Sequence, residues 1–186
     1  MRIDVAILGK GKHELRYIKA ILDRLNIIKK GVIGLIDCQE INNIPFLVRV
    51  LLFLCRIARK MKCIAIVIDA DSAEPKSRFQ SIIDGLRQER ANIGFIDKIC
   101  FQTFSVQVKI NNRTLTLITA VNKFNKISQF NYNVGECLED HVRMLLLRCG
   151  VKPPNVKRQL IQRGLETLKT ANKDIIKEAF PISTAC

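Results

Sequence analysis

The sequence predicts a single α/β domain of the Rossmann type, with a parallel core sheet covered by helices. In the first hundred residues, short apolar runs rich in β-branched side chains alternate with stretches whose apolar residues recur at helical spacing. This β-α-β-α-β-α order is typical of parallel strands joined by helical crossovers. The apolar content of 48% is enough for a sizeable core, and 186 residues fit one domain with a small appendage.

Each element of this first part has its own local signal. The strands are continuous apolar runs, and prolines at Pro45 and Pro75 are suited to the first turn of a helix. Asn42 or Asn43 is suited to cap the second helix, which is apolar around much of its circumference and should be well buried. The predicted order is strand Ile3–Leu8, helix Lys12–Leu25, strand Val32–Ile36, helix Asn43–Met61, strand Ile64–Ile68 and helix Glu74–Arg90.

The pattern changes after Asn92. Two extended runs joined by a short Asn-rich link predict a β-hairpin, and a polar segment after them is a candidate loop beside the site. A helix follows, and two prolines separate it from two basic helical pieces that are divided near Ala171. We therefore expect an α/β domain at 1–150 and a basic helical extension at 151–186 that packs on it. The segments are, in order, Ile99–Ile110, Leu115–Val121, Asn122–Val134, Glu136–Cys149, Pro153-Pro154 and Asn155–Phe180.

The formal net charge of +14 is large for this length and favours nucleic acid, another polyanion or an anionic membrane surface as a partner. From Lys98 to Gly135 the chain contains no acidic residue. The longest apolar stretch, Ile44–Ile57, is interrupted by two arginines and is too short to cross a bilayer, and the N-terminus lacks a signal-peptide pattern. We expect a cytoplasmic protein that does not enter a membrane. The candidate nucleic-acid-binding residues are Lys12, Lys109, Arg113, Lys123 and Lys126.

The seven cysteines are scattered without a Cys-x-x-Cys pair, and there are only two histidines, so a structural zinc site is not expected. We expect the cysteines to act as small buried hydrophobic residues. A disulfide becomes an option if the source is a hyperthermophile, whose cytosol can hold such bonds.

The strongest signal for a site is the segment Cys63–Asp71, in which a buried strand leads directly into two aspartates, Asp69 and Asp71. In parallel sheets, ligands bind beyond the carboxyl ends of the strands. Two carboxylates at this spacing are able to share a hard cation such as Mg²⁺, with Mn²⁺ as a substitute. Each has a structural alternative, because Asp69 could accept backbone amides and Asp71 could cap the following helix.

The exit of the first strand carries a glycine pair, Gly9 and Gly11, which invites comparison with phosphate-binding loops. The spacing fits neither a Walker loop nor a dinucleotide fingerprint, since Glu14 stands where the third glycine of the fingerprint would be. Nucleotide binding of these two kinds is therefore not expected.

Three motifs together resemble the Toprim domain of topoisomerases, bacterial-type primases and nucleases of the overcoming-lysogenisation-defect type. Lys10–Ile18 (KGKHELRYI) is similar to the family's Glu-Gly-x-x-Asp/Glu-x-x-Phe-Leu, and Asp69-Ala70-Asp71 to its Asp-x-Asp. Gly135–Asp140 (GECLED) is similar to a Leu-Glu-Asp segment of small Toprim-related proteins. The resemblance implies a Toprim-like Rossmann-type three-layer fold and metal-dependent phosphoryl transfer. The residues it implies as metal ligands are Asp69, Asp71, Glu139 and Asp140.

The chain departs from the Toprim pattern at Lys10, where the family has a glutamate that acts as metal ligand or general acid/base. A lysine repels Mg²⁺ but is able to hold a phosphate. Three explanations compete: the alignment is off by a residue or two, the site uses Glu14 and the other acids instead, or catalysis has been lost and binding kept. The candidate catalytic residues are Asp69, Asp71, Lys10 and Glu14.

Two classes of function follow from these observations. The first is Mg²⁺-dependent phosphodiester cleavage or phosphoryl transfer on DNA or RNA. The second is a catalytically inactive module that binds nucleic acid or another protein, with the apolar helix at Ile44–Ile57 as a candidate homodimer face.

Overall fold

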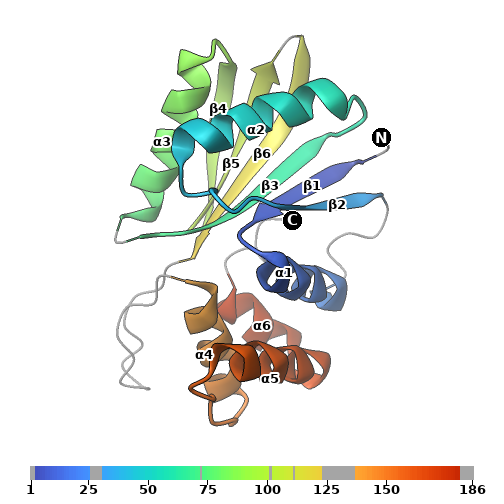
Figure 1. Ribbon diagram of the computed structural model, residues 1–186, viewed down its shortest axis with the longest axis vertical. Helices are drawn as coiled ribbons and strands as arrows, with labels where there is room; N and C mark the ends of the chain where they lie inside the picture. Colours follow the sequence, from blue (N-terminus) through green and yellow to red (C-terminus); the bar gives the residue numbers. More distant parts are fainter. Residues whose placement is uncertain are drawn as a thin grey trace.

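A six-stranded sheet forms the centre of the structure and carries helices on both faces (Figure 1). The strand order in this computed structural model is β2-β1-β3-β6-β5-β4. Neighbouring side chains of a strand point to opposite faces, so Ala6 and Leu8 enter one hydrophobic core and Ile7 enters the other. The prediction of a three-layer α/β domain is confirmed. The structure describes residues 3–25, 31–71, 73–100, 102–110, 112–122 and 137–180, without the side chains of residues 13 and 100.

The parallel half of the sheet consists of four strands whose carboxyl ends meet at one edge. Within it, β1 pairs with β2 and β3, and β3 pairs with β6. Gly9, Asp37, Asp69 and Asn122 are the last residues of these four strands. The bounds are β1 (Val5–Gly9), β2 (Ile33–Asp37), β3 (Cys63–Asp69) and β6 (Arg113–Asn122).

The antiparallel half joins β6 to β5 (Thr103–Ile110) and β4 (Asn92–Cys100). The predicted hairpin is confirmed as β5 and β6, but the single extended run expected at Ile99–Ile110 is wrong, because β4 ends at Cys100 and began at Asn92. The edge strand β4 is largely exposed, with Phe95 at 84%. It therefore lacks the apolar alternation from which the other strands were predicted.

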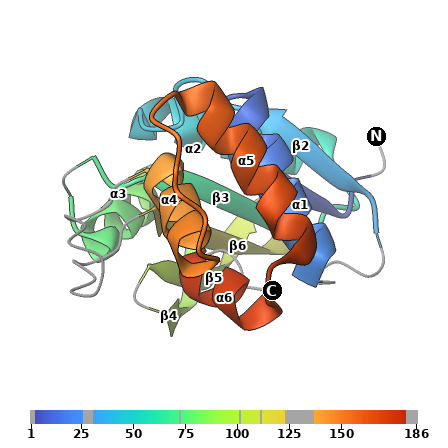
Figure 2. The same ribbon diagram turned by 90° about the horizontal axis from the view of Figure 1, so that it is seen from below.

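Two groups of helices cover the two faces. On one face lie α2 (Ile44–Ile57) and α3 (Pro75–Gln88), packed on the apolar side chains of β3, β5 and β6. On the other face lie four helices that share a second core, which Figure 2 shows from below. These are α1 (Lys12–Leu25), α4 (Leu138–Arg148), α5 (Lys157–Thr170) and α6 (Lys173–Ala179). Among the described residues, no helix combines the length and apolarity needed to cross a membrane.

Helix α2 begins as predicted but ends four residues before the predicted end. The Asn43 side chain caps it by accepting a hydrogen bond from Phe46 N at 3.2 Å. At the other end, the Arg113 guanidinium of β6 donates to the carbonyls of Cys55, Ala58, Arg59 and Met61. These bonds satisfy carbonyls that a longer helix would have paired internally. On the outer side of α2, Phe53 and Ile57 are 58% and 43% exposed, and the homodimer face stays a prediction.

The C-terminal helices are fastened to α1. The Arg24 side chain donates hydrogen bonds to Leu168 O and Ala171 O, at 3.2 and 3.1 Å, and thereby caps the end of α5. Gly164 permits the close approach, because a Cβ there would lie 2.6 Å from Val142 and 2.8 Å from the Tyr17 hydroxyl. The predicted boundary near residue 150 therefore falls between α4 and α5, two helices that share one core.

Candidate functional site

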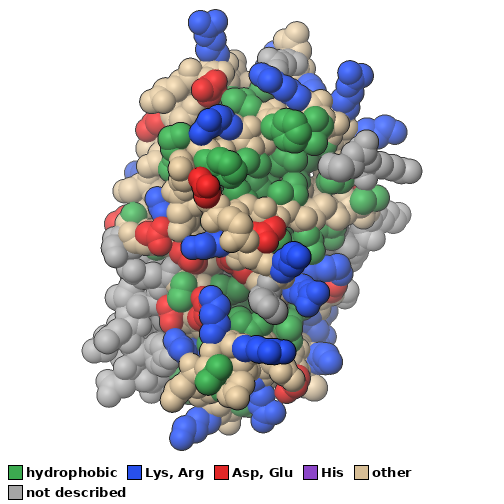
Figure 3. Space-filling view, viewed as in Figure 1, with side chains coloured by type: hydrophobic (Ala, Val, Ile, Leu, Met, Phe, Trp, Pro, Cys, Tyr) green, Lys and Arg blue, Asp and Glu red, His purple; other side chains and the backbone are tan. Residues whose placement is uncertain are grey.

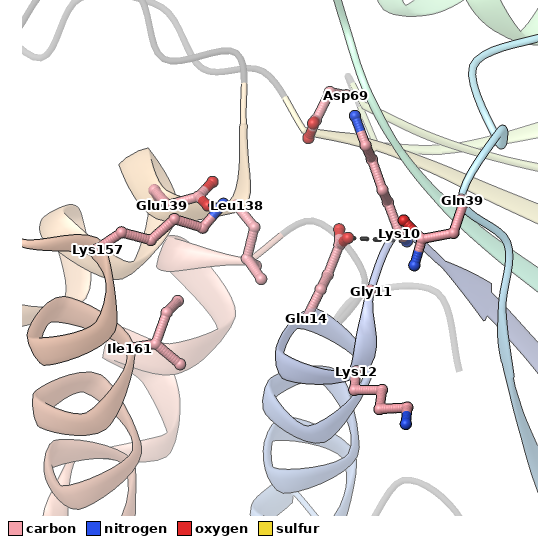
Figure 4. Close-up of a pocket in the computed structure, with 10 residues that line it drawn as sticks. All are labelled: Lys10, Gly11, Lys12, Glu14, Gln39, Asp69, Leu138, Glu139, Lys157 and Ile161. Atoms are coloured by element: carbon pink, nitrogen blue, oxygen red, sulfur yellow. Dashed lines mark hydrogen bonds and ion pairs between the residues drawn. The ribbon is translucent and has the colours of Figure 1, made fainter.

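A pocket of about 290 Å³ opens at the carboxyl edge of the parallel strands (Figure 4). Its walls come from the β1–α1 loop, the first turn of α1, the turn after β2, the end of β3 and the start of α4 and α5. This is the position at which doubly wound α/β folds bind ligands. The lining residues are Lys10, Gly11, Lys12, Glu14, Gln39, Asp69, Leu138, Glu139, Lys157 and Ile161.

Glu14 lies in the first turn of α1 and points into the pocket (Figure 4). Its carboxylate accepts a hydrogen bond from Lys10 N at 2.9 Å, which fixes the loop after β1. Burial and the negative charges of Asp69 and Glu139 raise the pKa of Glu14 from 4.5 to about 8. Glu14 therefore holds a proton near neutral pH, and a cation placed in the pocket would displace it.

Asp69 ends β3 on the opposite side of the pocket and is held by Asn122, the last residue of β6. The Asn122 amide donates to Asp69 Oδ1 at 3.0 Å. Burial raises the pKa of Asp69, and the charges of Glu139 and Asp71 add to the effect. The Lys10 side chain extends toward Asp69 (Figure 4) and acts in the other direction, lowering this pKa.

Glu139, at the start of α4, is the third carboxylate of the pocket. It forms an ion pair with Lys157 of α5. Burial by itself raises the pKa of Glu139, but the hydrogen bond and charge of Lys157 outweigh it and lower the pKa below its ordinary value. Glu139 is thus ionised and partly neutralised by a neighbouring cation.

Besides Glu14, the carboxylate of Asp37 at the end of β2 also holds the β1–α1 loop in place. Gly11 N donates to Asp37 Oδ1 at 2.8 Å, and the Gln39 side chain donates to the same oxygen at 2.8 Å. Gly11 has φ +86, a left-handed conformation that favours glycine. This arrangement brings Lys10 and Gln39 to the pocket, whereas Lys12 points away from the carboxylates (Figure 4).

Two of the predicted metal ligands are engaged elsewhere. Asp71 has φ +47 and accepts hydrogen bonds from Asn42 at 2.6 Å and Arg78 at 2.5 Å, which join the start of α3 to the turn before α2. Asp140 pairs with Arg143 at 3.4 Å and accepts a hydrogen bond from the Cys137 thiol at 3.1 Å. Neither Asp71 nor Asp140 lines the pocket.

The predicted nucleic-acid-binding residues are dispersed. Lys12 lies at the rim of the pocket, and Lys109 and Arg113 flank the β5–β6 turn. Because β6 runs parallel to β3, this turn is at the opposite edge of the sheet, about 30 Å from the pocket at 3.3 Å per residue. Arg113 is further committed to the end of α2. Lys123 and Lys126 lie outside the described residues.

Sequence reasoning missed three residues of the site: Gln39, Asn122 and Lys157. Asn122 was assigned to a loop, and Lys157 was one of several cations in a basic helix. Asn122 and Gln39 each had a local signal, because Asn122 directly follows the predicted strand Leu115–Val121 and Gln39 lies two residues after the end of β2. Lys157 reaches the pocket only through contacts between distant parts of the chain.

The chemistry of the pocket suits a hard cation, because Glu14, Asp69 and Gln39 offer carboxylate and amide oxygens. The oxygens are not gathered into a closed coordination shell. Within the described parts of the chain, no group of three or more His, Cys, Asp or Glu side chains is arranged to hold a metal ion.

The comparison with protein families matches residues 7–113, more than half of the chain, to the family described as "Protein of unknown function (DUF3226)". The chain belongs to this family. The DUF3226 match includes one wall of the pocket, with Lys10, Glu14 and Asp69, but ends before the wall formed by Glu139 and Lys157. Searches of the curated proteins and of the solved structures found no match.

Proposed function

We propose that this DUF3226 protein is a Toprim-related, Mg²⁺-dependent enzyme that cleaves or transfers phosphodiesters of nucleic acid at this pocket. The observation that carries the proposal is the convergence of Glu14, Asp69 and Glu139 from three separate elements on one pocket. Lys10 and Lys157 lie beside these carboxylates. Asp69 and Glu139 raise the pKa of Glu14, and acids whose pKa is strongly shifted by burial and by neighbouring charges are enriched in functional sites.

The same geometry supports one of the three explanations for Lys10. The Toprim pattern has an acid at the exit of β1, where this chain has Lys10. Glu14, about one helical turn later, lines the same pocket. Asp69 lies beside the amine end of the Lys10 side chain, and Glu14 lies beside the Lys10 backbone (Figure 4). Glu14 would therefore supply the carboxylate that the Toprim pattern has at the position of Lys10.

The residues divide into two roles. Glu14 and Asp69 would hold Mg²⁺, with Glu139 facing them, and the ion would polarise a phosphoryl oxygen. Lys10 and Lys157 would bind the phosphate as point charges. In the metal-free pocket the pKa of Glu14 is about 8, so binding of Mg²⁺ at Glu14 and Asp69 near neutral pH would release the Glu14 proton.

A second candidate function is nucleic-acid binding without catalysis. Two observations favour it: Lys157 already neutralises Glu139, and Lys10 extends toward Asp69. Cations in these places reduce the attraction of the pocket for Mg²⁺. The two functions predict different responses to metal.

The experiment compares wild type, Asp69→Asn and Glu14→Gln on labelled single- and double-stranded DNA and RNA, with Mg²⁺, Mn²⁺ or a chelator. Asp84→Asn is the matched control, because this exposed aspartate of α3 pairs with Gln80 and Arg87, two residues of its own helix, and does not line the pocket. Binding of Mn²⁺, followed by electron paramagnetic resonance, gives a readout that does not depend on turnover.

Metal-dependent cutting that Asp69→Asn abolishes and Asp84→Asn retains would support the enzyme. Salt-sensitive binding without cutting and without Mn²⁺ binding would support the silent binder. Cutting that survives Asp69→Asn would place the chemistry elsewhere, and absence of both cutting and binding would refute both functions.

A further inference from the structure

A second, larger groove of about 630 Å³ runs along one side of α5. Its described lining residues recur at helical spacing, so they form a single stripe along the helix. Half-buried Leu165 and buried Ile161 form the apolar floor. The complete described lining is Lys157, Arg158, Ile161, Gln162, Leu165, Glu166 and Lys169.

The groove continues from the candidate active site. Lys157 and Ile161 line both the groove and the pocket that holds Glu14 and Asp69. A chain lying in the groove would therefore pass over Lys157 directly into the pocket.

The rim of the groove is cationic. Its described lining contains three Lys or Arg residues and one acid, and the first turn of α5 contains no acid. That acid, Glu166, already interacts with Arg163 at 3.4 Å and with Gln162. Arg158 and Lys169 are exposed at the two ends of the stripe. Figure 3 shows Lys and Arg side chains around apolar surface over the helices in the lower part of the molecule.

We infer that this groove binds single-stranded nucleic acid and leads it to the pocket. The inference rests on the proposed function and names its substrate class. The stripe from Lys157 to Lys169 is about 18 Å long at 1.5 Å per residue, and this is the length of about five stacked nucleotides.

The apolar floor distinguishes a single strand from a duplex. Bases of a single strand are free to pack their apolar faces on Ile161 and Leu165 while the phosphates contact the cationic rim. In a duplex the bases are stacked inside, so only the rim would contact it. An acidic peptide would also contact the cationic rim, but it has no bases to pack on the apolar floor.

The test is fluorescence anisotropy with a labelled strand of about 12 nucleotides and with its duplex, both in chelator. Arg158→Glu combined with Lys169→Glu should weaken single-strand binding about ten-fold or more and reduce the slope of log affinity against log salt by about 2. The matched control is Lys60→Glu combined with Lys62→Glu, two exposed lysines before the start of β3, which should have a much smaller effect. Leu165→Gln should weaken binding of the single strand and leave binding of the duplex unchanged. This variant still tests the inference if the Arg158→Glu and Lys169→Glu double variant does not fold.

The inference would be overturned if the groove variant and the control variant lost the same affinity for the single strand. It would also fail if the duplex bound as tightly as the single strand, or if polyglutamate displaced the strand as well as an unlabelled oligonucleotide did. The anisotropy assay measures binding in chelator, so its result does not depend on whether the protein cleaves nucleic acid in the presence of metal. The two proposals are therefore refuted by different measurements.

Discussion

Glu14→Gln tests the electrostatics of the pocket with little change in its shape. Glutamine has nearly the same size, and its side-chain oxygen is still able to accept the hydrogen bond from Lys10 N. The folded protein raises the pKa of Glu14 from 4.5 to about 8. Between these pH values the folded state keeps a proton that the unfolded chain has released, so the stability of the wild type falls as pH rises through this window.

The magnitude follows from the size of the pKa change. At about 1.36 kcal/mol per pKa unit, the loss is about 3 kcal/mol between pH 4.5 and 7 and about 5 kcal/mol above pH 8. Water that enters the half-buried pocket reduces these values. We expect Glu14→Gln to unfold with a free energy about 2 to 3 kcal/mol larger than that of the wild type at pH 7.

The assay is urea denaturation followed by far-UV circular dichroism at several pH values from about 5 to 8. Glu14→Gln should match the wild type at the acidic end and become progressively more stable toward pH 8. The control is Asp23→Asn on the same helix, which removes an exposed pair with Lys19 and should change stability by less than about 1 kcal/mol at every pH. A constant difference between Glu14→Gln and the wild type across this range would refute the reasoning.

Three further variants test other contacts. Lys157→Met should raise the pKa of Glu139, measured by NMR titration of its carboxyl carbon; an unchanged pKa would mean that the ion pair is not formed. Arg113→Met should lower the free energy of unfolding in urea by about 3 kcal/mol, because carbonyls at the end of α2 lose their donors, and Arg113→Lys should recover only part of this loss. Gly164→Ala should destabilise by about 1 to 3 kcal/mol in thermal unfolding, because its Cβ would clash with Tyr17; a gain in stability, as helix propensity alone predicts, would contradict this packing.

The elements with strong local signals were predictable from the sequence. Helix α1 has its predicted bounds, and β3 differs by one residue at each end, because buried runs and helical stripes are properties of neighbouring residues. The edge strand β4 was missed because an exposed strand has no apolar period to detect. The end of α2 was placed too late because it depends on Arg113, a residue from a distant strand.

The candidate site divides in the same way. Asp69 was identified because it ends a buried strand, and Glu14 because Lys10–Ile18 resembles the Toprim pattern and Glu14 is an acid in the first turn of the helix. The pairing of Asp71 with Arg78 turns that aspartate away from the pocket, which the spacing between Asp69 and Asp71 did not reveal. Lys157 entered the pocket only through the packing of α5 against α1 and α4, a contact that no local pattern encodes.

The pocket lies between two parts of the molecule, and the two hydrogen bonds of Arg24 join α1, in the first part, to the end of α5, in the second. One wall belongs to the sheet edge and α1, and the other to α4 and α5. A ligand that contacts both walls stabilises their arrangement. At free concentration [L] and dissociation constant Kd, its binding adds RT ln(1 + [L]/Kd) to the free energy of unfolding. Amide hydrogen exchange in α4 and α5 should slow in step with occupancy. The rigidity of the helical layer thus reports on occupancy of the pocket, so compounds can be screened by thermal stability before any reaction is known.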